Sequence, residues 1–97
     1  MSSQVLSVGK HRNGNRIWLQ NLQAKGFQPG DLIRVNFHGS AIIVTRDQTS
    51  KRKVSAPSKG GVLDLSNKAV TEWVQKHSVA TVSVEYTPSQ IIITKED

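Results

Sequence analysis

Two short segments of the chain concentrate side chains that can bind a polyanion. The first carries cationic and amide side chains around a glycine, at Lys10, Arg12, Asn13, Asn15 and Arg16. The second carries mostly lysines around a loop with proline and glycine, at Lys51, Arg52, Lys53 and Lys59. Lysine and arginine neutralise phosphates, and arginine and asparagine also hydrogen-bond to the edges of guanine and adenine. We predict that these residues bind DNA.

The two basic segments differ in composition, which predicts different roles. Arg16 and its neighbouring asparagines form a compact turn that suits contacts to bases. The second segment is looser and richer in lysine, which suits contacts to phosphates. For Arg16 an alternative stays open, in which it is a strand residue that holds the turn or pairs with an acid.

The overall charge favours the same class of partner. Thirteen Lys and Arg against seven Asp and Glu give a net charge of +6 and a pI of about 10.1. A solvated basic surface without a partner is the alternative. Because both basic clusters fall at matching places in two halves of the chain, a polyanion-binding surface is favoured.

No set of residues has the types and spacing of an active site. The three histidines, His11, His38 and His77, are scattered, and the chain has no cysteine. Neither a metal-ligand spacing nor a nucleophile with a base is present in the sequence pattern. We therefore predict no enzyme activity, no catalytic residue, no cofactor and no metal site.

A repeated hydrophobic pattern predicts the elements that position the basic segments. The first copy predicts strands at 5–8, 16–19, 32–37 and 41–45, with a turn at 13–15 and a helix of little more than one turn at 21–25 that Gly26 stops. The second predicts strands at 53–55, 62–65, 81–86 and 91–94, with a helix at 67–77 capped by Ser66. The last two strands of each copy match at an offset of 49 positions, so that Phe37 corresponds to Tyr86.

This repeat predicts one domain, residues 1–97, built from residues 1–48 and 49–97 with a linker at 47–50. A copy this short cannot bury a core alone, so we expect both copies to share one core. The predicted fold class is mainly β with short helices.

The two tryptophans carry different expectations. Trp73 lies at helical spacing with Ala69, Val70 and Val74, which predicts a core position. Trp18 could face outward and stack on a base or pack on a partner, but a core or dimer contact is favoured.

The residues 13–19 and 26–35 resemble the basic turn, helix end and third strand of the AbrB/MazE family of swapped-hairpin DNA-binding domains, and the SymE-type toxins share this fold. The chain departs from the family in its shorter first helix and in Gln20 and Ser66, where a proline usually follows the second strand. In the family two chains intertwine. The resemblance therefore implies a swapped-hairpin, pseudo-dimeric barrel in which one chain supplies both halves.

These observations favour a small transcriptional regulator that binds double-stranded DNA. MazE-like antitoxins carry a long acidic C-terminal tail, whereas this chain ends at Asp97, which favours a regulator over an antitoxin. The alternatives are an antitoxin-like or adaptor protein with a toxin-type protein partner, and an RNA or single-strand binder. Pairing of pseudo-dimers into a homo-oligomer stays open. With no signal-peptide pattern and no membrane-length apolar stretch, we expect a cytoplasmic location and no membrane partner.

Overall fold

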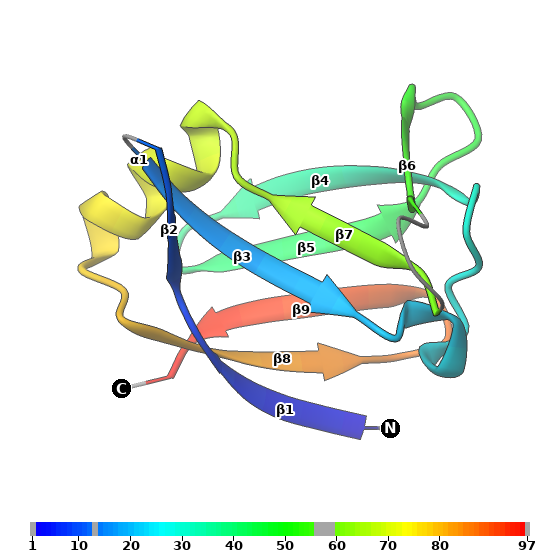
Figure 1. Cartoon of the computed structure of the whole chain (residues 1–97), viewed down its shortest axis with the longest axis horizontal. Coiled ribbons are helices and arrows are strands. Elements are labelled where there is room, and N and C mark those ends of the chain that lie inside the picture. The colour runs from blue at the N-terminus through cyan, green and yellow to red at the C-terminus, as the bar shows by residue number, and fades with distance from the viewer. Residues whose placement is uncertain (1, 13, 56–59, 97) are drawn as a thin grey trace.

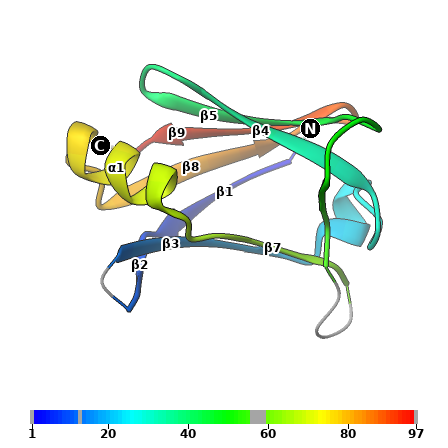
Figure 2. The same ribbon diagram turned by 90° about the horizontal axis from the view of Figure 1, so that it is seen from above.

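A computed structural model describes residues 2–12, 14–55 and 60–96 of the chain. The described residues form a mainly β fold, as the sequence predicts, with two sheets that face each other (Figures 1 and 2). The first half of the chain contains β1 (Ser2–Ser7), β2 (Gly9–His11), β3 (Gly14–Gln20), the 3-10 turn η1 (Leu22–Lys25), β4 (Leu32–His38) and β5 (Ala41–Arg46). The second half contains β6 (Arg52–Lys53), β7 (Val62–Leu65), α1 (Lys68–His77), β8 (Thr81–Tyr86) and β9 (Gln90–Lys95).

Most predicted elements are confirmed within one or two residues, and the differences have local causes. The helix α1 begins at Lys68 because Asn67, and not Ser66, is its N-cap: the Asn67 Oδ1 accepts a hydrogen bond from the Val70 N–H at 3.0 Å. Gly26 ends η1 in the left-handed region with a φ of 95°, as predicted. Strand β2 is not predicted by the sequence pattern, because Gly9–His11 shows no hydrophobic alternation.

The predicted barrel is wrong, because the strands of the described residues separate into two sheets. One sheet has six strands in the order β1-β8-β9-β5-β4-β6, and the other has three in the order β2-β3-β7. Among the described strands, the chain passes from one sheet to the other four times, between β1 and β2, between β3 and β4, between β6 and β7, and between β7 and β8. Ser55, after β6, forms a bridge to Val62 of β7. β6 has only two residues, too few to continue hydrogen bonding around a closed barrel.

Both sheets contain strands from the two halves of the chain. β1 pairs with β8 and β6 pairs with β4, so each edge strand of the larger sheet lies beside a strand of the other half. β5 pairs with β9 in the middle of that sheet, and β3 pairs with β7 in the smaller one. Neither half therefore has a complete sheet of its own.

The core fills the space between the two sheets. Alternating positions point inward from each strand, such as Ile17 and Leu19 of β3 and Val82 and Val84 of β8, and all four are fully buried. The helix α1 adds Val70 and other apolar side chains at one end of the layers, and η1 lies at the opposite end (Figure 2). Both halves thus contribute to one core, which is consistent with a single domain.

Candidate nucleic-acid interface

Both basic segments reach the same residue, Asp64, on the outer face of the three-stranded sheet. The Asp64 carboxylate accepts hydrogen bonds from Nε and Nη2 of Arg16, each at 3.0 Å. The backbone carbonyl of Asp64 accepts a third from Nη2 of Arg52 at 2.7 Å. Arg16 comes from the first basic segment and Arg52 from the second, so the β3–β7 pairing brings together cations that lie far apart in the sequence.

The position of Arg16 follows from strand alternation. Ile17 and Leu19 point into the core, so Arg16 and Trp18 must point out of the sheet beside Asp64 of the neighbouring strand. The bidentate contact shows that Arg16 pairs with an acid, which is the alternative left open by the sequence. The contact uses only Nε and Nη2 of Arg16. A guanidinium has five N–H donors, and those of Nη1 take no part in the contact with Asp64.

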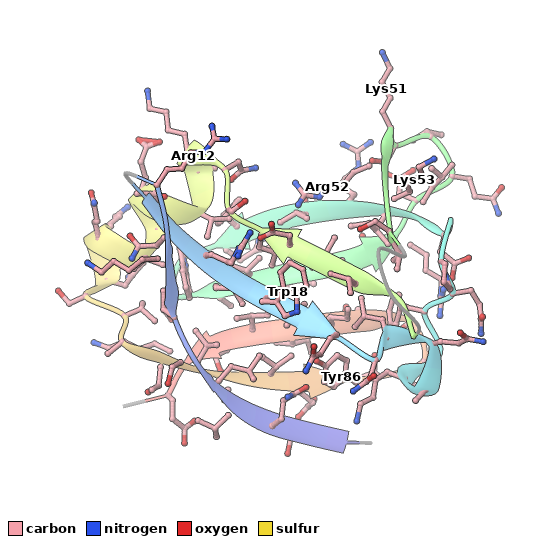
Figure 3. The ribbon with its side chains drawn as sticks, in the orientation of Figure 1. Arg12, Trp18, Lys51, Arg52, Lys53 and Tyr86 are labelled. Atoms are coloured by element: carbon pink, nitrogen blue, oxygen red, sulfur yellow. The ribbon has the colours of Figure 1, made fainter. Side chains whose placement is uncertain are left out.

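Trp18 lies directly opposite Asp64 in the β3–β7 pair and is not part of the core. Its side chain is 38% exposed, which excludes the expected core position. The Arg16 guanidinium carbon lies 5.1 Å from the Trp18 ring centroid, and the Trp18 Nε1–H donates to Gln20 Oε1 at 3.3 Å. Trp18 is therefore held among polar neighbours on an outer surface, at the front of the molecule in Figure 3.

Trp73 lies in the core, as its helical spacing predicts, and is only 5% exposed. Its Nε1–H donates to the Gly39 carbonyl at 3.0 Å, which joins α1 to the β4–β5 turn. Val70 and Val74 are buried beside it, but Ala69, which the helical spacing placed on the same face, is exposed.

Four other cations of the predicted set extend into solvent. Within the part of the chain that the structure describes, no ion pair involves the exposed side chains of Lys10, Arg12, Lys51 and Lys53. Figure 3 shows Arg12 beside the start of α1, and Lys51, Arg52 and Lys53 on the segment that contains β6. We call the set of Arg12, Arg16, Lys51, Arg52 and Lys53 the basic edge.

The remaining predicted residues contribute less to this geometry. The backbone N–H of Asn15 donates to Thr71 Oγ1 at 2.9 Å, which ties the start of β3 to α1. Arg12 has a φ of 55°, in the left-handed region, where the chain turns between β2 and β3. Asn13 and Lys59 lie outside the described residues.

Two other arginines are neutralised by acids away from the basic edge. Arg34 pairs with Asp47 at 2.5 Å, and Arg46 pairs with Asp31 at 2.8 Å. Hydrogen bonds from the Thr49 side chain and from Arg34 lower the pKa of Asp47 to about 2. Each of these pairs is net neutral, so Arg34 and Arg46 do not add to the positive charge of the basic edge.

A shallow surface cavity of about 300 Å³ lies between α1 and the end of the β4–β5 hairpin. Phe37 and Trp73 form its apolar part, and Glu72, Lys76 and His77 are its titratable side chains. Among the described residues, no group of three His, Cys, Asp or Glu side chains could hold a metal ion. No helix in the described ranges is long and apolar enough to cross a membrane.

Comparison of the chain with family models, curated proteins and solved structures finds no match to any of them. We therefore infer the function of the protein from the residues and contacts of this chain.

Proposed function

We propose that this protein is a small transcriptional regulator that binds double-stranded DNA through the basic edge. The observation that carries the proposal is the convergence of Arg16 and Arg52 on Asp64. This convergence places cations from two segments on one connected surface. Since the only acid in that contact is already paired with Arg16, the surface retains a positive charge that attracts phosphates.

The fold that we propose is a single-chain pseudo-dimer of the AbrB-like, swapped-hairpin kind. The strand order of the larger sheet, β1-β8-β9-β5-β4-β6, supports this fold. If each strand is exchanged for its counterpart in the other half (β1 for β6, β4 for β8, β5 for β9), the order becomes its own reverse. The segments that pair across the halves, β1 with β8 and β6 with β4, are those that a swap would exchange. A pseudo-symmetric domain presents two related surfaces to successive parts of one duplex.

Within the basic edge we assign two kinds of contact. Lys51 and Lys53 are exposed cations that would neutralise phosphates whatever the DNA sequence. Arg16 is fixed by Asp64, with its Nη1 atom left to donate to a base edge. Because the two basic segments differ, the preferred site need not be a perfect palindrome.

Equilibrium binding to a labelled DNA duplex at a series of salt concentrations tests the proposal. If the protein neutralises four to six phosphates, log K against log salt has a slope of about −4 to −5. The same assay with single-stranded DNA and RNA of equal length tests the preference for duplex. A flat salt dependence, or no binding at low salt, contradicts the proposal and favours a protein partner.

A pair of charge variants locates the surface. Lys51→Ala combined with Lys53→Ala should weaken binding to all duplex sequences alike and reduce the slope by about two, since each phosphate contact contributes about one. The matched control is Lys76→Ala, which removes an exposed lysine of α1 outside the basic edge. Equal losses in both variants would contradict the assignment of the basic edge.

A further inference from the structure

The outer face of the three-stranded sheet carries a second feature, the exposed Trp18. Three large hydrophobic side chains are exposed among the described residues: Val5, Trp18 and Phe37. They belong to three different strands, β1, β3 and β4, and Trp18 has the polar neighbours Arg16, Gln20 and Asp64. A protein-docking surface usually presents a contiguous apolar patch, which this isolated aromatic ring does not provide.

The electrostatic surroundings of Trp18 favour an anionic partner. The one acid beside it, Asp64, is neutralised by Arg16, and Arg52 also contacts Asp64. The Arg16 guanidinium carbon lies over the indole ring at 5.1 Å from its centroid, which is a cation–π contact. An aromatic ring with adjacent cations has the combination that binds unpaired nucleobases, because the ring stacks on the base while the cations contact its phosphates.

We propose that Trp18 is a stacking site for an unpaired nucleobase, so that the preferred ligand is DNA with a locally unpaired or single-stranded base. This inference rests on the proposed function, since the basic edge supplies the phosphate contacts. It goes beyond that function by naming a feature of the DNA that a fully paired duplex lacks. A paired base offers its ring faces to its neighbours in the stack, whereas an unpaired base can leave the helix.

The experiment compares three DNA probes at one salt concentration: a perfect duplex, the same duplex with one unpaired thymine, and an oligothymidine strand. The intact protein should bind the duplex with the unpaired thymine about tenfold or more tightly than the perfect duplex, the size expected for one base–aromatic stack. Trp18→Ala should remove this preference and leave affinity for the perfect duplex nearly unchanged. Trp18→Phe, which keeps a ring in the strand, should retain part of it and guards against misfolding of the alanine variant.

Tryptophan fluorescence gives an independent readout, because one of the two tryptophans is exposed and the other is buried. The unpaired probes should quench the emission of the intact protein and of Trp73→Phe, whose remaining indole is Trp18. They should not quench Trp18→Phe, whose remaining indole is buried Trp73. Quenching that instead depends on protein concentration without DNA would identify Trp18 as a contact between copies of this chain and overturn the proposal.

The outcomes separate this inference from the proposed function. Salt-dependent binding to the perfect duplex with no preference for the unpaired thymine overturns the stacking site and leaves duplex binding standing. Tight binding to the unpaired probes alone supports the stacking site and overturns duplex binding. Failure of all three probes overturns both.

Discussion

Ile43 and Ile92 lie directly opposite each other in the β5–β9 pair and are 49 positions apart in the sequence. This separation equals the offset at which the hairpins of the two halves match. Trp18 and Asp64 form a similar central pair between β3 and β7, with 46 positions between them. The difference corresponds to a longer connection in the second half, where the ten-residue α1 stands in place of the four-residue η1. The pseudo-dimer that we propose requires this geometry, because two related antiparallel strands adopt it when a two-fold axis passes between them.

The first prediction concerns residues 1–48 and 49–97 produced separately. Each should be unfolded or should associate into dimers, because the pairs β1–β8, β5–β9, β4–β6 and β3–β7 all join the two halves. NMR spectra and sedimentation of each half give the measurement, and mixing the halves should restore the dispersed spectrum of the intact chain. A half that folds as a monomer would contradict the shared core and the pseudo-dimer.

The second prediction concerns the pair of Arg16 and Asp64. The side chains are about one-third exposed and make two parallel hydrogen bonds, so a double-mutant cycle with Arg16→Gln and Asp64→Asn should give a coupling energy of about 1 kcal/mol in urea unfolding. A coupling near zero would show that the contact does not persist in solution.

DNA binding by the Arg16→Ala variant tests whether Arg16 also contacts a base. Arg16→Ala should weaken a specific DNA site by about 1–3 kcal/mol and spare non-specific DNA, if Nη1 contacts a base. The readout is the affinity ratio between specific and non-specific duplexes, measured where the variant is folded. Equal loss on both duplexes would assign Arg16 a structural or phosphate-contacting role.

The third prediction concerns Tyr86, the one tyrosine of the chain. Burial raises its pKa to about 12, and its hydroxyl donates to Gln4 Oε1 at 2.6 Å, which joins β8 to β1. Tyrosinate absorbance should therefore rise near pH 12 in the folded protein and near pH 10 in urea. Since the folded pKa lies above the unfolded one, the stability contributed by the neutral hydroxyl is complete below about pH 10 and is lost as the pH rises to about 12.

The control for this titration is Tyr86→Phe, in which the absorbance step should vanish. The stability of this variant should also show no loss from this group between pH 10 and 12. A folded protein that titrates near pH 10 would show that Tyr86 is accessible to water in solution.

The fourth prediction concerns Gly61, where the structure needs a residue without a side chain. Its φ is 80°, its carbonyl accepts a hydrogen bond from Leu22 N–H, and a Cβ would lie 3.3 Å from Val54 Cγ1. Gly61→Ala should lower the free energy of unfolding by more than the 1–2 kcal/mol that the left-handed conformation alone costs. Gly39→Ala is the matched control, with a φ of 59° and open space around it, and should show the conformational cost alone. Equal losses in the two variants would show that the site around Gly61 relaxes freely.

The sequence alone was sufficient to predict the mainly β class, most strand positions and the core role of Trp73. Strand alternation and helical spacing are local patterns, so Leu32–His38 and Thr81–Tyr86 could be recognised without knowledge of their partners. The N-cap was misplaced by one residue because Ser66 and Asn67 are adjacent and both have suitable side chains.

Only the tertiary structure decided which strands pair and which charged groups meet. The contact between Arg16 and Asp64 spans 48 positions and depends on the register of β3 against β7, which no local pattern encodes. The packing of the two sheets also decided which face of β3 is buried: Ile17 and Leu19 point into the core, so Trp18 lies outside it. The separation into two sheets was also a tertiary outcome, because it depends on where the chain crosses between the sheets, after β1, β3, β6 and β7. Hydrophobic patterning is the same for a barrel and for two facing sheets.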